Sequence, residues 1–157
     1  MDDRFLLRQA LALARQARAE GNHPFAALLA DPDGVVLMES GNLSGSTPDR
    51  TAHAERVLMT RASLAYPANF LERCTLFTSA EPCAMCAGAA YWAGVGRVVY
   101  ALSEHELRRL TGNHPENPTL DLPCRTVFVA GQRTVEVVGP MLEDEARAVH
   151  DGYWAAP

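Results

Sequence analysis

Lysine is absent from this 157-residue sequence, so arginine supplies all of its fixed positive side-chain charge. The 14 arginines face 19 acidic residues, and the formal net charge is −5. Contacts to a phosphate backbone depend on Lys and Arg. The arginines are spread along the chain, with Arg108-Arg109 as the only adjacent pair. We therefore expect no nucleic-acid partner, although a local basic patch stays compatible with this charge.

Long hydrophobic runs are also missing. The chain starts Met1-Asp2-Asp3-Arg4-Phe5, and an acidic start without an apolar run behind it predicts no secretory signal. The longest uncharged stretch, 82–96, is rich in Ala and Gly. It is shorter than the roughly 20 residues that a membrane-spanning helix needs. We expect no membrane association and a cytoplasmic location.

Cysteine is scarce, with four residues at positions 74, 83, 86 and 124. A chain of this length can form one domain with a sizeable core and needs no disulfides to hold it. In a reducing compartment, a close pair such as Cys83 and Cys86 indicates metal or redox chemistry. We expect Cys74 and Cys124 to be free thiols in the core or in loops.

Hydrophobic patterning predicts alternating helices and strands, without internal repeats. The apolar spacing favours an α/β sandwich around a mixed sheet. Residues 111–123, rich in Pro and Asn, are expected to form a loop, and 125–129 fit either a helix or a strand. Asp49 or Thr51 could cap the second helix, and Pro82 suits the first turn of the third. Helices are predicted over 4–20, 51–63, 82–93, 104–110 and 142–154, and strands over 24–30, 35–39, 74–79, 97–101 and 134–138.

The segment Glu81-Pro82-Cys83-Ala84-Met85-Cys86 carries the strongest chemical signal. Residues three apart share one face of a helix, so both cysteines lie together near the helix N-terminus. Free amides and the positive end of the helix dipole favour thiolates there. Two thiolates suit zinc.

His53 is the best candidate for a third ligand, because it lies at the start of another predicted helix. Three protein ligands leave the fourth zinc position open for water, as in catalytic sites. Glu55, two residues further on, is placed to act on that water as a general base. As an acid it can then return protons to the ring nitrogen and the departing amine.

A His-x-Glu followed by Pro-Cys-x-x-Cys is the signature of zinc nucleobase deaminases. On these residues the sequence resembles the cytidine-deaminase superfamily. The resemblance implies one deaminase domain over 1–157, built as a three-layer α/β/α sandwich with a mixed five-stranded sheet. It also implies one Zn²⁺ per subunit, loss of ammonia from an amidine-like carbon, and a homodimer.

Within that superfamily the chain resembles the group of guanine deaminases and transfer-RNA adenosine deaminases. Asn42, in a Gly-Asn loop, stands where this group places an asparagine that hydrogen-bonds the base. The runs 23–27 and 89–93 are similar to segments of guanine deaminases. The resemblance implies substrate contacts from Phe25, Asn42, Ala54, Trp92, Asn113 and His114.

Guanine deaminases of the Bacillus type carry aspartates near 111–117, where this chain has Asn113 and His114. We therefore expect a purine-type base or nucleoside, guanine-like first, and keep four alternatives open. These are a transfer-RNA adenosine deaminase, a cytosine or deoxycytidylate deaminase, a redox pair, and a zinc-stabilised interaction module. Glu81 is interpreted as a helix cap or as support for the site. The aromatic end Tyr153-Trp154 fits either a tail that closes over the site or the last turn of a surface helix.

Overall fold

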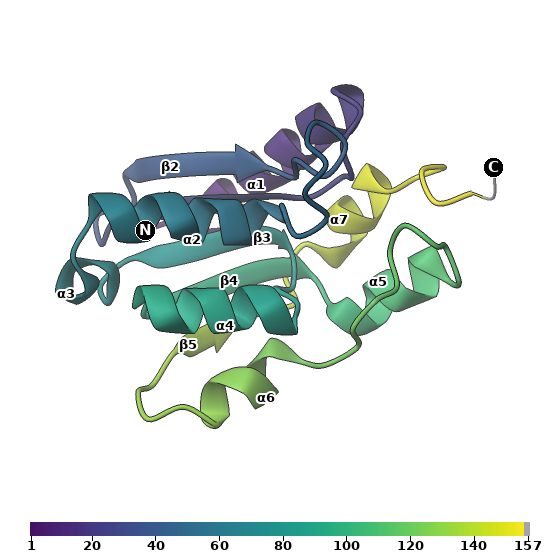
Figure 1. Ribbon diagram of the computed structural model, residues 1–157. Helices are drawn as coiled ribbons and strands as arrows, with labels where there is room; N and C mark the ends of the chain where they lie inside the picture. Colours follow the sequence, from purple (N-terminus) through teal and green to yellow (C-terminus); the bar gives the residue numbers. More distant parts are fainter. Residues whose placement is uncertain (156–157) are drawn as a thin grey trace.

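The computed structural model describes residues 1–155. Its centre is a five-stranded sheet with the strand order β2-β1-β3-β4-β5 (Figure 1). β1 pairs antiparallel with β2 and β3, whereas β3, β4 and β5 run parallel. The predicted mixed sheet is thus confirmed. The strands are β1 (Ala26–Ala30), β2 (Val36–Gly41), β3 (Thr75–Ala80), β4 (Arg97–Leu102) and β5 (Glu136–Val138).

Helices cover both faces of the sheet and complete three layers. α1 (Asp3–Ala19) and α7 (Glu143–Val149) pack on one face, and α2 (Ala54–Ala65), α4 (Ala84–Ala93) and α6 (Cys124–Val129) form the opposite layer. The short helices α3 (Ala68–Leu71) and α5 (Glu104–Thr111) lie in the connections. This is the three-layer α/β/α architecture that the resemblance implied.

The core is divided by the alternation of side chains along each strand. Leu28 of β1 is paired in register with Phe77 of β3, which is paired with Val99 of β4, and all three face α1. The neighbouring positions Leu29, Leu76 and Val98 face α2 and α4 instead. β1 and β3 are buried on both faces, which explains their continuous apolar sequence.

Strand register also gathers several loops at one edge of the sheet. Ala26, at the start of β1, pairs with Gly41, at the end of β2. Ala80, at the end of β3, pairs with Leu102, at the end of β4. The chain before β1 and the chains after β2, β3 and β4 therefore meet there.

The second helix begins three residues later than predicted. Asp49 and Thr51 do not cap it, because the Asp49 carboxylate accepts hydrogen bonds from the backbone N–H and the hydroxyl of Thr51. These bonds close a local turn, and His53 becomes the N-cap of α2. Pro82 likewise precedes the N-cap Cys83 of α4 and does not lie in the first turn.

The C-terminal segment departs furthest from the prediction. α7 ends at Val149, not at residue 154, because the chain turns through Gly152 with a left-handed φ of 70°. Trp154 folds back and is only 8% exposed. Residues 125–129 are helical, within α6, and α3 was not predicted. No helix within residues 1–155 is long and apolar enough to cross a bilayer.

Candidate metal centre and active site

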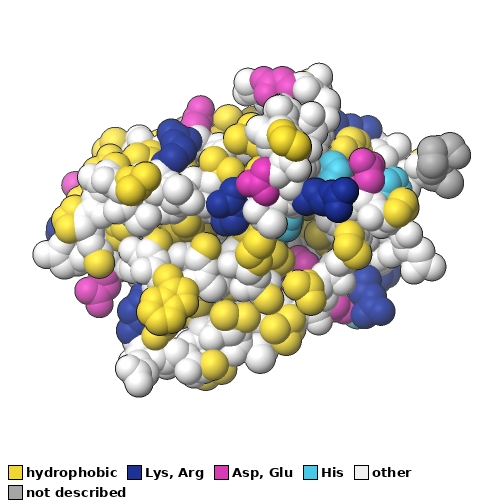
Figure 2. Space-filling view, in the orientation of Figure 1, with side chains coloured by type: hydrophobic (Ala, Val, Ile, Leu, Met, Phe, Trp, Pro, Cys, Tyr) yellow, Lys and Arg dark blue, Asp and Glu magenta, His cyan; other side chains and the backbone are white. Residues whose placement is uncertain are grey.

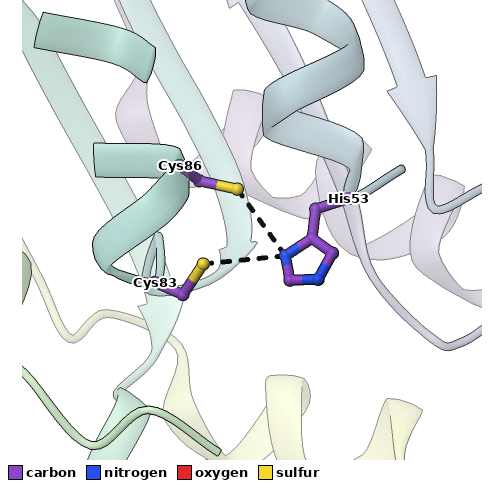
Figure 3. Close-up of side chains that lie close together, drawn as sticks. All are labelled: His53, Cys83 and Cys86. Carbon is purple, nitrogen blue, oxygen red and sulfur yellow. Dashed lines mark hydrogen bonds between the residues drawn. The ribbon is translucent and has the colours of Figure 1, made fainter. Parts of the chain in front are cut away.

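His53, Cys83 and Cys86 converge at the edge of the sheet where the loops meet (Figure 3). The Nδ1 atom of His53 lies 3.6 Å from the Sγ atom of each cysteine. The three donor atoms all lie within 4.8 Å of one another. Two segments that are 30 residues apart in sequence thus form one compact group of nitrogen and sulfur ligands.

Two helix starts create this group. His53 is the N-cap of α2 and Cys83 is the N-cap of α4, both in extended backbone conformations. Neither side chain caps its own helix, so both are directed at the shared centre. The free amides and dipoles of two helix N-termini then favour negative charge at one point.

The donor geometry fits zinc. Tetrahedral bonds of about 2.3 Å to sulfur and 2.0–2.1 Å to nitrogen place these ligands about 3.6 Å apart. The structure has this spacing between His53 and both cysteines. Cys74 and Cys124 are buried free thiols outside the group, as the sequence predicted. Three protein ligands would leave one tetrahedral position for water.

Hydrogen bonding within the trio already separates the protonation states of the two thiols. The hydrogen bond from the Cys86 thiol lowers the pKa of Cys83 to about 4, and His53 adds to this effect. The same shared proton and the burial of Cys86 raise its own pKa. The bond to Cys83 raises the pKa of His53. A cation bound here would replace the protons that these groups share.

Glu55 lies in the first turn of α2 and is 5% exposed. Burial raises its pKa to about 7, while the neighbouring charge of His53 acts in the opposite direction. A carboxyl group with a pKa near neutrality can both accept and return a proton. Such a pKa is consistent with the acid and base role predicted for Glu55 from the sequence.

Two further acidic residues support the same edge of the sheet. One carboxylate oxygen of Glu81 accepts the backbone N–H of Glu104 at 2.9 Å, and the other accepts that of Cys124 at 2.7 Å. Glu81 therefore ties the starts of α5 and α6 to the Cys83 segment, which confirms its interpretation as a cap. Glu104 is 4% exposed, and burial together with the nearby anionic groups raises its pKa to about 9. Glu104 could not be predicted from the sequence, because only the β3–β4 register places it here.

Asn42 is buried, and its orientation is fixed by the loop. Its Oδ1 accepts both the backbone N–H and the hydroxyl of Ser44, at 2.9 and 2.6 Å. A backbone N–H must donate, so the Nδ2 group of Asn42 points the other way. Its own backbone N–H donates to the carbonyl of Phe25 at 2.9 Å, which places these two predicted substrate contacts side by side.

The other predicted substrate contacts are distributed unevenly. Ala54, the first residue of α2, is buried and has an N–H group without an intrahelical partner. His114 is half-buried, with its ring 5.3 Å from that of Trp154. Asn113 is exposed, and Trp92 is 84% exposed on α4. The structure thus joins Phe25 and Asn42 by a backbone hydrogen bond, places Ala54 directly after His53 and leaves Trp92 on the surface.

Comparison with known proteins agrees with this geometry. Residues 1–102 match the family model for the cytidine and deoxycytidylate deaminase zinc-binding region. The chain belongs to this family. Its members share hydrolytic deamination of nucleobases or nucleosides, so the chain is a deaminase of that class.

Individual relatives differ in substrate. The chain is 43% identical over 152 residues to a probable cytosine deaminase of Schizosaccharomyces pombe, covering 94% of this chain and 90% of that protein. It is 39% identical over 106 residues to the guanine deaminase of Bacillus subtilis, covering 67% of each. A solved mutant protein in complex with 8-azaguanine superposes with a TM-score of 0.80 at 27% identity, covering 98% of this chain and 85% of that one.

The ligand assignment predicts that Cys86→Ser binds zinc far more weakly, by at least tenfold, because removing one of three protein ligands opens the site. Zinc content after dialysis, measured by inductively coupled plasma mass spectrometry, checks this. Cys74→Ser is the matched control, since Cys74 is equally buried but lies outside the ligand group, with its thiol donating to the Phe70 carbonyl. Full zinc occupancy in Cys86→Ser would remove Cys86 from the ligand set.

Proposed function

We propose that this protein hydrolytically deaminates a free nucleobase, with a guanine-type purine as its first candidate substrate. The observation that carries this proposal is the buried carboxyl group of Glu55 beside a three-ligand metal centre. The resemblance in fold to a protein that binds 8-azaguanine supports the purine. The guanine deaminase relative supports it as well.

The residues divide the chemistry between them. Zn²⁺ held by His53, Cys83 and Cys86 would supply Lewis acidity that lowers the pKa of a water molecule. Glu55 accepts a proton from the attacking water and delivers it to the ring nitrogen. It then accepts the remaining proton from the hydroxyl group of the adduct and delivers it to the amine, which leaves as ammonia while the carbonyl group forms. Burial keeps bulk water away from this carboxyl group, so the protons that it holds are passed to the substrate.

Binding of the ring falls to the loops around the centre. The Nδ2 group of Asn42 and the N–H of Ala54 offer donors to a carbonyl or ring nitrogen. Phe25 gives an apolar wall next to Asn42. Donors fixed in advance by other hydrogen bonds need no reorganisation when the base binds.

Charge argues for a small substrate over transfer RNA. With no lysine and a net charge of −5, the chain has few groups to neutralise phosphates. Cytosine is the second candidate, because the relative with 43% identity across most of its length is a probable cytosine deaminase. Both bases present an amino group on an amidine-like carbon, so the same proton transfers serve either.

Ammonia release by the zinc-loaded protein tests this proposal. The panel comprises guanine, adenine, cytosine, their nucleosides, deoxycytidylate and an anticodon stem-loop RNA. We expect turnover of guanine or cytosine. In Glu55→Gln we expect kcat to fall at least a hundredfold, because glutamine keeps the shape of the side chain but cannot act as a general base. Zinc content and circular dichroism of Glu55→Gln should match the parent.

Each other result has a defined meaning. Turnover of cytosine alone would show that the substrate is a pyrimidine and not a purine, and would leave the proposed roles of the residues unchanged. Turnover of the RNA alone would contradict the free-base assignment. Undiminished activity in Glu55→Gln would remove Glu55 from the mechanism. No ammonia release from any compound of the panel, with the protein folded and zinc-loaded, would support the alternative of a zinc-stabilised interaction module.

We also propose that two copies of the chain associate through α4 and α6. Trp92 and Val129 are among the most exposed large hydrophobic residues, at 84% and 82%, and α4 packs against α6. Figure 2 shows hydrophobic side chains gathered over this region. Exposed apolar patches of this kind favour protein association.

We further propose a cytoplasmic location, because the free thiols suit a reducing compartment.

The association predicts that Trp92→Asp converts a dimer into a monomer, because a charge replaces the largest apolar group of the patch. Sedimentation velocity at micromolar concentration measures the change in mass. Val35→Asp is the matched control, since Val35 is also exposed but lies beside the β1–β2 turn. A parent protein that sediments as a monomer would contradict the dimer.

A further inference from the structure

The C-terminal segment is fastened by one buried hydrogen bond between side chains. The indole N–H of Trp154 donates to Nδ1 of His150 at 2.9 Å. Both residues are buried, and their rings stack at 6.2 Å between centroids with a 20° interplanar angle. An indole can only donate, so Nδ1 must be the unprotonated nitrogen of His150.

Trp154 contacts rings from two other segments that border the proposed site. Its ring centroid lies 5.3 Å from His23, 6.1 Å from Phe25 and 5.3 Å from His114. The carbonyl of Phe25 accepts the backbone N–H of Asn42, and the next residue, Leu43, donates its N–H to the carbonyl of Ala52, which directly precedes His53. The indole therefore lies where the chain before β1 and the loop after α5 approach the centre.

The neighbours of Trp154 are fixed independently of this bond. The Oδ1 atom of Asn22 accepts the backbone N–H groups of Gly45 and Ser46 at 2.9 and 2.8 Å, so the chain before β1 is tied to the loop that leads to His53. Arg18 donates to the carbonyl of Val149 at 2.9 Å. These bonds position the wall around the indole, whereas the indole itself relies on His150 for its polar contact.

We propose that His150 is a positioning residue, whose Nδ1 holds the Trp154 indole as the outer wall of the base pocket and so favours a free base over its nucleoside. This rests on the proposed deamination of a free base. A ribose attached to the ring would have to pass the indole, and moving the indole would leave its buried N–H group without an acceptor. Burial lowers the pKa of His150 to about 4, so its Nδ1 stays available as an acceptor at neutral pH.

The chain offers a direct spectroscopic test, because it has only two tryptophans. In a Trp92→Phe background, Trp154 is the sole tryptophan fluorophore. His150→Phe keeps a ring but removes the acceptor, so we expect red-shifted emission and at least twofold stronger quenching by acrylamide. His150→Asn restores an acceptor at nearly the same place and should restore the parent spectrum. Tyr153→Phe is the matched control, because it changes the adjacent ring only by its hydroxyl group.

Kinetics of the same variants test selectivity. His150→Phe should raise KM for the preferred base about tenfold, with a smaller change in kcat. It should also lower the selectivity ratio, which is kcat/KM for the base divided by kcat/KM for its nucleoside. Rescue of KM and of that ratio by His150→Asn would separate positioning from general destabilisation. Should His150→Phe fail to fold, Trp154→Phe removes the hydrogen-bond donor instead. It should likewise lower the ratio of kcat/KM for the base to kcat/KM for the nucleoside.

The outcomes separate this inference from the proposed function. Unchanged fluorescence in His150→Phe, or an equal change in His150→Asn, would show that the bond does not hold the indole. Changed fluorescence with an unaltered ratio of kcat/KM for the base to kcat/KM for the nucleoside would overturn the role of His150 in selectivity. A parent protein that turns over none of the tested bases would refute the proposed function, while the fluorescence comparison would still decide whether His150 fixes Trp154.

Discussion

The meeting of two helix N-termini at one edge of the sheet is the constraint on which the rest of the structure depends. α2 and α4 pack against each other and against the sheet, and their starts bring His53 and Cys83 within 3.6 Å. The positive ends of both helix dipoles favour anionic ligands at this point, and a cation bound by those ligands would neutralise their charge. The parallel β3–β4 pair fixes this position, because both strands end side by side at Ala80 and Leu102.

The glutamates around the centre have different roles because their burial and hydrogen bonds differ. Glu81 accepts two backbone N–H groups and holds α5 and α6 in place. Glu55 has no such structural task, and burial brings its pKa to about 7, which suits proton transfer. Glu104, with a pKa raised to about 9, is held in its neutral form at physiological pH. Glu55 and Glu104 thus differ in pKa because their burial and neighbouring charges differ, whereas Glu81 serves as a hydrogen-bond acceptor for two helix starts.

The sequence was sufficient for the parts of the fold that depend on local pattern. The continuous apolar runs of β1 and β3 predicted buried strands, and the spacing of Cys83 and Cys86 predicted a shared helix face. The start of α2 was misplaced because Asp49 is an equally good helix cap on paper, and only the fold shows that it closes a turn with Thr51. The C-terminal helix was extended to Trp154 because helical spacing also joins His150 to Trp154, although the left-handed turn at Gly152 ends it earlier.

Site residues that depend on contacts distant in sequence could not be predicted in this way. The burial of Glu104 follows from strand register, and the packing of Trp154 on His23 and His114 joins three separate segments. Hydrophobic spacing could not tell whether Trp92 lines a pocket or an outer surface, and the structure places it on the surface. The grouping of His53, Cys83 and Cys86 was predictable because zinc chemistry requires particular residue types at a fixed spacing.

X-ray absorption at the zinc edge of the purified protein tests the central claim most directly. The account predicts two sulfur neighbours at about 2.3 Å and two nitrogen or oxygen neighbours at about 2.0–2.1 Å, consistent with His53, both cysteines and one exchangeable water. Binding of a base should then alter the light-atom shell and leave the sulfur shell unchanged. Three or four sulfur neighbours, or a shell that no substrate perturbs, would indicate a closed structural site and contradict the account.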